Sequence, residues 1–220
     1  MIFIPVSTFL CCFFTLGGSH NTDPLVGNAN NFIDILIANI KGELADNLNP
    51  YHLPEKSINF EQEIFQLPLR GQASLYDGHL IGLNTLHRAG DCTILKNGNT
   101  VNITVSLGMG VMIGSYKGSV TFMGRGPRVD IIGRLGYASV KMDVIHDSLL
   151  GENRLQAFNL EQLNGLTINI KGLGPLSFVV NKLSSAILTL FEGLVKDVVE
   201  WTLKPIVETK VRNYDLSFLD

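Results

Sequence analysis

One apolar stretch near the C-terminus decides the fold: LSSAILTLFEGLVKDVVEW, which spans Leu183 to Trp201. Its apolar residues recur at the three- and four-residue spacing of one helix face, and charged residues such as Lys196 and Glu200 occupy the remaining face. So large an apolar face must be buried, so we expect a long helix that begins near Ser177 and is embedded in the protein. Pro205 is expected to kink this helix, and Ile206, Val207 and Val211 suggest a further turn or two. The apolar positions are Leu183, Ala186, Ile187, Leu190, Phe191, Leu194, Val195, Val198, Val199 and Trp201.

Alternating apolar and polar residues predict strands in the middle of the chain. The clearest run is 100–107, in which Val101, Ile103, Val105 and Leu107 alternate with polar residues. One apolar face and one polar face are typical of an antiparallel sheet that packs on one side. Many of the 22 glycines lie among these strands, where they would allow a sheet to bend sharply. Further alternating runs are 65–70, 120–122, 140–144 and 166–170, and the expected turns are Asp77-Gly78, Asn97-Gly98, 124–127 and 151–153.

The N-terminal part of the chain contains a second amphipathic pattern. From Asn30 to Leu48 one helical stripe is apolar, and Asn49-Pro50 is expected to end this helix. The segment Tyr51–Gln62 is expected to be irregular. The predicted fold class is therefore α+β: a curved antiparallel β-sheet wrapped around a long C-terminal α-helix, with an N-terminal amphipathic helix. The N-terminal stripe consists of Phe32, Ile33, Leu36, Ile37, Ile40, Leu44 and Leu48.

The first residues resemble a secretory signal peptide. Ile2 to Phe14 is almost wholly apolar and small residues follow at 17–19, although Pro5 comes early and no basic residue precedes the apolar run. The alternative, a membrane anchor, would need about 20 apolar residues, which this run does not reach. We expect residues 1–19 to be a signal peptide cleaved near Ser19, and residues 20–220 to be one secreted, extracellular domain. The charge-free stretch of the C-terminal helix, Leu183–Phe191, is also too short to span a bilayer, so no transmembrane segment is expected.

Two sequence features bear on the secreted state. Cys11 and Cys12 would be removed with the signal peptide, so Cys92 would be the one cysteine left and no internal disulfide could form. Cys92 is expected to be a buried small hydrophobe rather than a reactive thiol. Asn102 begins the sequon Asn-Ile-Thr and would accept an N-linked glycan in the secretory pathway.

Several function classes find no support in the residues. The formal charge of -3 without a basic run argues against a nucleic-acid partner. The glycines of Gly108–Gly114 are followed by a strand-like segment, whereas a dinucleotide-binding loop requires a helix. Asp143 and Asp147 would lie on the opposite face of a strand from His146, so they do not form a metal or acid–base group. Without a nucleophile elbow either, we expect no enzyme activity, no metal and no cofactor. Arg125 and Arg128 are expected in a solvated turn, which could attract an anionic headgroup.

A family resemblance is visible once these elements are placed. The segment GLNTLHRAGD, Gly82 to Asp91, resembles the corresponding strand of the group-seven house-dust-mite allergens, and Gly172–Phe191 with Trp201–Arg212 is similar to their C-terminal helix. Those allergens are similar in fold to insect juvenile-hormone-binding and takeout proteins and to one half of the bactericidal/permeability-increasing and lipid-binding proteins. The resemblance implies a curved sheet around a long helix, with apolar ligands entering the gap. Hormone-binding and takeout proteins carry an N-terminal disulfide that this chain cannot form, which favours the mite-allergen branch.

These observations lead to two functional hypotheses. The first is a secreted, non-catalytic carrier of lipids or other apolar small molecules. Its pocket would be lined by Ile187, Leu190, Phe191 and Leu194 of the helix with Phe122 and Met142 of the sheet. The alternative is a recognition module that docks on microbial lipid or on a protein partner through an apolar patch. Apolar residues at helical spacing are usually core, so the sequence leaves open whether the helix and sheet enclose a cavity or a filled core.

Overall fold

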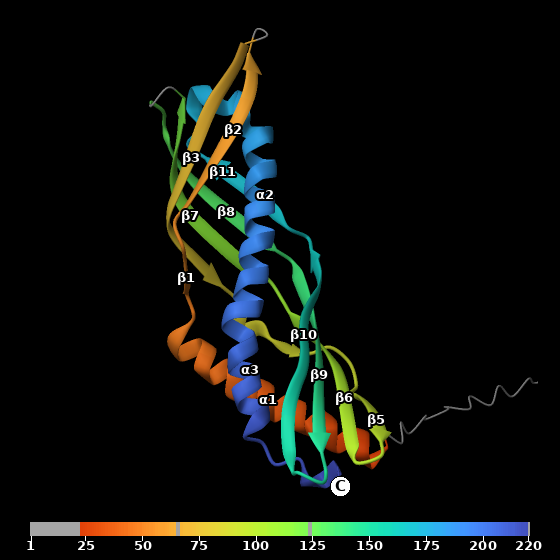
Figure 1. Cartoon of the computed structure of the whole chain (residues 1–220). Helices are drawn as coiled ribbons and strands as arrows, with labels where there is room; N and C mark the ends of the chain where they lie inside the picture. Colours follow the sequence, from red (N-terminus) through yellow and green to blue (C-terminus); the bar gives the residue numbers. More distant parts are fainter. Residues whose placement is uncertain (1–22, 65–66, 123–124, 220) are drawn as a thin grey trace, which may run out of the picture.

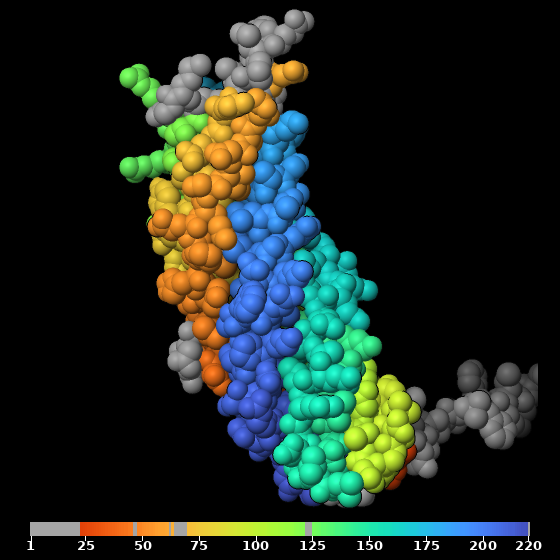
Figure 2. Space-filling view, viewed as in Figure 1, coloured from red at the N-terminus to blue at the C-terminus, as the bar shows by residue number. Residues whose placement is uncertain are grey.

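The computed structural model describes residues 23–64, 67–122 and 125–219, and shows an elongated, curved molecule (Figures 1 and 2). A long C-terminal helix runs along the molecule beside two antiparallel sheets, and an N-terminal helix crosses one end (Figure 1). The antiparallel pairing and the two helices confirm the predicted α+β class.

The strands form two sheets rather than the single sheet that the sequence predicted. One sheet has the order β1-β3-β7-β8-β11 with β2 paired to β3, and the other has the order β10-β9-β6-β4 with β5 paired to β6. Every pair is antiparallel. The strands are β1 (Tyr51–Leu53), β2 (Lys56–Ile64), β3 (Leu67–Ile81), β4 (His87–Arg88), β5 (Thr93–Asn97), β6 (Thr100–Met109), β7 (Met112–Phe122), β8 (Arg128–Leu135), β9 (Tyr137–Asp147), β10 (Glu152–Asn164) and β11 (Thr167–Lys171).

The two sheets are joined by strands that pass directly from one into the other. β6 continues into β7, β8 into β9 and β10 into β11, with one or two residues between the members of each pair. Gly110, Gly136 and Gly165 lie at these three crossings. Gly165 has a φ of +71°, a backbone conformation that residues with side chains rarely adopt, so a side chain there would be strained. Glycines therefore bend the strand layer, as the sequence suggested, and the bend divides it into two sheets.

The C-terminal helix is continuous but changes its winding near Pro205. A 3₁₀ segment (Gly174–Val179) leads into α2 (Val180–Asp197), a π-helical turn (Val198–Leu203) follows, and α3 (Lys204–Arg212) completes the helix. Proline cannot donate the backbone hydrogen bond that an α-helix needs, and the π-turn, in which the Lys204 amide donates to the Val199 carbonyl, absorbs the irregularity. The predicted kink is thus a local widening of the helix.

Most of the predicted apolar face of this helix is buried, but Ala186 and Leu190 are only half-buried and Trp201 is exposed. Leu183, Ile187, Phe191, Leu194, Val195, Val198 and Val199 are at most 4% exposed. Trp201 is 76% exposed, so its inclusion in the embedded stripe was wrong. The π-turn places Trp201 on the solvent side, between exposed Glu200 and half-buried Thr202.

The length of this helix bears on the prediction that the chain has no transmembrane segment. By length and composition alone, Gly174–Arg212 could cross a membrane, because one 18-residue window has a mean hydropathy of 1.4. The length of the charge-free stretch Leu183–Phe191 was therefore too strict a criterion for excluding a membrane-spanning helix. The buried core helix of a soluble protein can have the same composition, and α2 packs on β2 and β11, so the absence of a transmembrane segment stays a prediction.

The N-terminal helix α1 spans Pro24–Asn47 and starts earlier than the predicted Asn30. Asp23 caps it by accepting a hydrogen bond from the Leu25 amide at 3.0 Å, and Pro24 occupies its first position. The predicted stripe is confirmed: Phe32, Ile33, Leu36, Ile37, Ile40 and Leu44 are at most 6% exposed.

Two local predictions in the segment from Tyr51 to the end of β3 were wrong. Tyr51–Gln62 is not irregular, because it contains β1 and most of β2, where Ile58 and Phe60 are half-buried at alternate positions. Asp77-Gly78 is not a turn but a bulge inside β3, at which the pairing with β7 shifts register and Asp77 adopts a φ of +53°. The Asn97-Gly98 turn is confirmed, as is the strand β6.

Candidate ligand-binding site

The site predicted from the sequence lies between the long C-terminal helix and the curved sheet, and in the structure α2 packs mainly on the six-stranded sheet. The sheet curves so that its edge strands, β2 and β11, both pack against α2. Figure 2 shows the helix surface exposed between these flanking strands. The outward face of α2 is polar, with Lys182, Glu192 and Lys196 exposed, so only the inward face meets the apolar lining of the sheet.

The inward face of α2 is fixed in the sheet by one aromatic ring. Phe191 lies on Gly114 of β7 and Gly133 of β8, which are directly opposite each other in the register of the two strands. A β-carbon at Gly114 would lie 2.2 Å from the Phe191 ring, and one at Gly133 would lie 2.8 Å from it. Tyr116 meets the same ring edge-on, with centroids 6.0 Å apart. Because glycine has no side chain, these two positions leave enough room for the Phe191 ring. We call the pair the glycine seat.

Tyr116 adds one polar group to the apolar surface of the sheet that faces α2, and the hydroxyl of this group is hydrogen-bonded. Its side chain is 2% exposed and its hydroxyl donates a hydrogen bond to the Pro54 carbonyl oxygen at 2.9 Å. Burial raises the pKa of Tyr116 to about 12, so the phenol stays neutral. This surface therefore carries no charge at this point.

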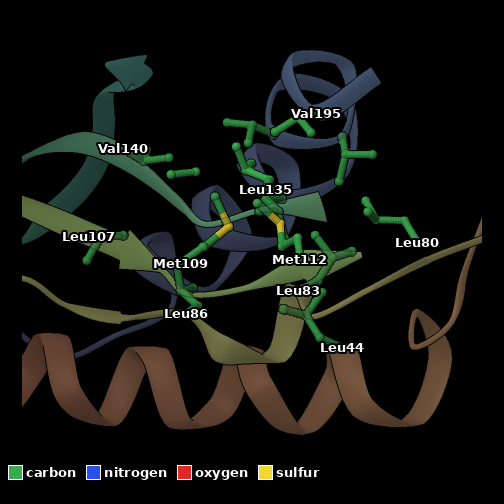
Figure 3. Close-up of a cluster of buried hydrophobic side chains, with 14 of the residues drawn as sticks. Leu44, Leu80, Leu83, Leu86, Leu107, Met109, Met112, Leu135, Val140 and Val195 are labelled. Atoms are coloured by element: carbon green, nitrogen blue, oxygen red, sulfur yellow. The ribbon is translucent and has the colours of Figure 1, made fainter. Parts of the chain in front are cut away.

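The buried interior also includes the junction between the two sheets (Figure 3). Met109 at the end of β6 and Met112 at the start of β7 are at most 1% exposed, and they lie with Leu83, Leu135 and Val195 in one cluster. Methionine side chains are unbranched and adapt to irregular space. The two methionines therefore make the junction a part of the core that can adapt to changes in packing.

The structure brings together three of the six predicted lining residues. Ile187, Phe191 and Leu194 share the buried face of α2, while Leu190 beside them is only half-buried. Met142 is fully buried, but on β9 of the five-stranded sheet, whereas α2 packs mainly on β2 and β11.

Phe122 ends β7 in the other sheet, and its side chain lies outside the described residues. The two strand residues of the prediction thus belong to different sheets. Gly114, Gly133 and Tyr116 were missed, although two glycines at facing strand positions are a recognisable signal of a close approach.

Two hollows lined by described residues lie over strands of the six-stranded sheet. One of about 480 Å³ lies over β3, β7 and β8, lined by residues that include Asp77, Lys117 and Lys171. Another, of about 400 Å³, lies between β2 and β3 and is lined by residues including Phe60 and Arg70. Ile187, Phe191 and Leu194 are at most 4% exposed, so a guest molecule at these positions would have to displace side chains that now pack there.

The polar groups of the interior serve structural roles. His146 is buried and bonds through Nδ1 to Asn153 Oδ1 at 2.8 Å, while Asn153 donates to the Tyr214 carbonyl. Asp143 accepts a hydrogen bond from Thr104, and Asp147 accepts from the amides of the turn that follows it. Among the described residues there is no group of three or more His, Cys, Asp or Glu side chains that could hold a metal ion.

Cys92 and the segment before it attach α1 to the five-stranded sheet. Cys92 is 4% exposed and burial raises the pKa of its thiol to about 11, as predicted for a buried small hydrophobe. Its amide donates to Asn30 Oδ1 at 2.8 Å. Arg88 donates to both carboxylate oxygens of Asp34 at 2.9 and 3.0 Å and to the Gly90 carbonyl. Gly82–Asp91, the segment that carried the resemblance, is therefore where the sheet holds α1.

Sequence comparisons agree with this resemblance. The family model of the group 7 allergens matches residues 28–211. Mite allergen Lep d 7 of Lepidoglyphus destructor is 22% identical over 194 residues, which cover 86% of this chain and 87% of that protein. Mite allergen Der p 7 of Dermatophagoides pteronyssinus is 22% identical over 185 residues, which cover 83% and 85% respectively.

Two solved structures show a more distant likeness. A crystal structure of lipopolysaccharide binding protein has a TM-score of 0.43 at 15% identity over 83% of this chain, and the match spans 40% of that chain. Takeout 1 of Epiphyas postvittana has a TM-score of 0.23 at 15% identity, covering 69% of this chain and 70% of that one. Scores this low carry no functional inference. The family model, in contrast, matches nearly the whole described chain, and this match shows that the protein belongs to the group 7 allergen family.

Proposed function

We propose that this protein is a secreted, non-catalytic carrier of lipids or other hydrophobic small molecules, which it holds between α2 and the sheets. The observation that carries this proposal is the way in which α2 closes the six-stranded sheet. β2 pairs with β3 and β11 pairs with β8, so the two edges flank the helix without pairing with each other. We call the space between α2 and the edge strands β2 and β11 the slot. The slot could widen if α2 moved relative to these two strands. Such a movement changes side-chain packing but breaks no hydrogen bond between paired strands.

The lining determines what kind of ligand the slot would accept. Apart from Ser139, His146 and Asn153, the buried side chains of the described residues are hydrophobic, and they form one continuous cluster. Transfer of an acyl or terpenoid chain from water into such surroundings contributes about 0.8 kcal/mol per methylene. With few polar groups to orient it, such a ligand would be selected by length and shape rather than by a headgroup.

A docking module is the second candidate, and one observation favours it. Trp201 is 76% exposed on the outward side of the helix, and Leu95, Leu149 and Leu150 are 65–75% exposed. Large exposed apolar side chains mark many interaction surfaces. A docking module without a carrier function should be purified without bound lipid.

Ligand retention and one matched pair of variants test the carrier proposal. Protein from a eukaryotic host should yield extractable lipid by mass spectrometry, and the delipidated protein should bind a fluorescent fatty acid. Ala186→Phe places a ring at a half-buried position of α2 and should weaken probe binding at least about ten-fold, because it fills the slot. Ser185→Phe places the same ring at the neighbouring exposed position and should change binding less than about two-fold.

The carrier proposal fails if the wild-type protein binds none of a panel of fatty acids, terpenoids and bacterial lipids. It also fails if Ala186→Phe and Ser185→Phe bind the probe equally well. Circular dichroism on each variant separates loss of the slot from loss of the fold.

Secretion carries a separate prediction at Asn102. The residue is half-buried on the outer face of β6, where it pairs with Leu95 and Ile145 of the neighbouring strands. Its Oδ1 atom is enclosed and has no hydrogen-bond partner among the described residues. Because the sequon is modified before the chain folds, we expect N-linked glycan at Asn102, with the attached sugar directed outward.

Glycosidase treatment of the protein secreted by a eukaryotic cell should increase its gel mobility, and Asn102→Gln should abolish this shift. Unchanged mobility of the treated wild type would contradict the glycan. Retention of the wild type inside the cell would contradict the signal peptide at residues 1–19, which lies outside the described residues.

A further inference from the structure

The turn between β9 and β10 presents two leucines to solvent. Leu149 and Leu150 are 75% and 69% exposed, and among the large hydrophobic side chains of the described residues only Trp201 is more exposed than Leu149. The turn lies at one end of the elongated molecule, beside the C-terminal end of the chain (Figure 1). Turns usually contain polar residues or glycine, so an adjacent pair of leucines at this position suggests a role outside the fold.

The turn is rigid, so these leucines are held in a fixed position. Asp147 Oδ1 accepts hydrogen bonds from the amides of Leu149 and Leu150 at 3.0 and 3.2 Å. The Gly151 amide donates to the Asp147 carbonyl at 2.8 Å, and the φ of Gly151 is +64°. The Ser148 amide donates to the Asn99 carbonyl of the neighbouring hairpin at 2.9 Å. These bonds also direct the negative charge of Asp147 into the turn.

Charged side chains of both signs lie beside the leucines: the arginines Arg154 and Arg212, and the exposed acid Glu152. A hollow of about 380 Å³ adjoins the turn, lined by Gly151, Glu152, Asn153, Arg154 and Arg212. Arg154 is exposed on β10, opposite Ile145 of β9. Arg212, at the end of α3, contacts Glu208 at 3.0 Å, but both side chains are well exposed, so this ion pair holds the guanidinium weakly. Guanidinium groups bind phosphate through two parallel hydrogen bonds.

We propose that this end of the molecule, formed by Leu149, Leu150, Arg154 and Arg212, docks on the surface of a phospholipid bilayer. The two leucines enter the boundary between headgroups and acyl chains, and the two arginines meet lipid phosphates. The charge complementarity between the arginines and phosphate, next to apolar side chains on a rigid turn, selects a bilayer over a protein partner. The docking end is separate from the α2 slot, so it goes beyond the proposed carrier function and can be tested without any ligand.

Vesicle binding by the intact protein tests the proposal. The wild-type protein should sediment with phosphatidylcholine vesicles, and more strongly when phosphatidylglycerol replaces part of the lipid. Leu149→Ser/Leu150→Ser should weaken partitioning at least about ten-fold on both kinds of vesicle. Arg154→Gln should weaken it about five-fold, mainly on the vesicles that contain phosphatidylglycerol.

Ile132→Ser is the matched control, because Ile132 is a large aliphatic residue that is 42% exposed on β8 of the other sheet. This variant should bind vesicles as the wild type does. All substituted side chains are exposed, and an unchanged thermal midpoint confirms that each variant is folded.

A tryptophan at the turn identifies the surface that enters the lipid. Trp201 is the one tryptophan of the chain, so Trp201→Phe gives a dark background in which Leu150→Trp reports on the turn alone. Its emission should shift to the blue when vesicles are added, and brominated lipids should quench it.

Three results would overturn the proposal: no vesicle binding by the wild type, equal loss of binding in the Ile132→Ser control, or retained vesicle binding without a change in the emission of Leu150→Trp. The last result would mean that another surface contacts the bilayer. Failure of the fatty-acid probe to bind would instead count against the carrier alone.

Discussion

Phe191→Ala is expected to lower the free energy of unfolding by about 3–5 kcal/mol, the largest effect of any single truncation in α2. The phenyl ring is 3% exposed and lies on the backbone of β7 and β8 at Gly114 and Gly133. These glycines have no side chains that could move into the vacated space. The seat therefore stays open after truncation, and the loss of apolar burial is joined by the cost of a cavity.

Urea denaturation followed by circular dichroism measures this loss. Phe178→Ala serves as the control, because Phe178 precedes the same helix but is 49% exposed, and its truncation should cost less than about 1 kcal/mol. Equal midpoints for the two variants would mean that Phe191 does not fill the glycine seat.

A double-mutant cycle tests the seat itself. Gly114→Ala alone should destabilise the protein by about 1–3 kcal/mol, since the new β-carbon would lie 2.2 Å from the Phe191 ring. In the Phe191→Ala background the same methyl group enters the cavity and should cost little or even stabilise. The coupling between the two positions should therefore exceed about 1 kcal/mol, and additive effects would contradict direct contact.

The sequence predicted this region well where periodicity carried the information. The buried face of α2, the buried stripe of α1 and the alternation in β6 follow from spacing alone, because a residue's face is set by the geometry of its own helix or strand. Trp201 was the one exposed residue of the predicted face. The spacing placed it on the buried face, and the π-turn before Pro205 changed the phase of the helix at that residue.

The features that the sequence did not predict depend on contacts between distant segments. The pairing of Gly114 with Gly133, and the ring of Phe191 over both, join three elements that no local pattern connects. The placement of Met142 in the other sheet depends on where the strands cross from one sheet to the next, at Gly110, Gly136 and Gly165. Glycines in strands showed that the layer would bend but not where, because many strand glycines do not lie at crossings.

The segment Gly82–Asp91, which resembles the group 7 allergens, contacts α1 in the fold, and its sequence alone did not predict this contact. The segment contains little regular structure, only a short 3₁₀ turn and β4. In the fold it contributes Arg88, which bonds to Asp34 of α1, and two leucines that α1 covers. A segment that makes both polar and apolar contacts with another element can tolerate few changes, which gives a physical reason for the resemblance.

Leu86→Ala is the second substitution for which we expect a large effect, and it tests whether the segment Gly82–Asp91 holds α1. Leu86 is 0% exposed in the junction cluster of Figure 3, where Leu44 of α1 and Met109 of β6 also lie. Its truncation should lower the free energy of unfolding by about 2–5 kcal/mol, because helix, 3₁₀ turn and strand meet at one buried side chain. Leu86→Met keeps the volume and should cost less than about 1.5 kcal/mol. Leu95→Ala is the control at a 65% exposed position of β5 and should stay within about 0.5 kcal/mol of the wild type.

Hydrogen exchange of the Leu86→Ala variant distinguishes a local loosening of α1 from a general loss of stability. If the segment 82–91 holds α1, the amides of Pro24–Asn47 should lose protection before those of β7 and β8, which pair in the other sheet. Loss of protection in all of these elements at once would mean that α1 is no more dependent on Leu86 than the rest of the fold. Unchanged protection in α1 would show that the polar contacts of Arg88 hold the helix without the leucine.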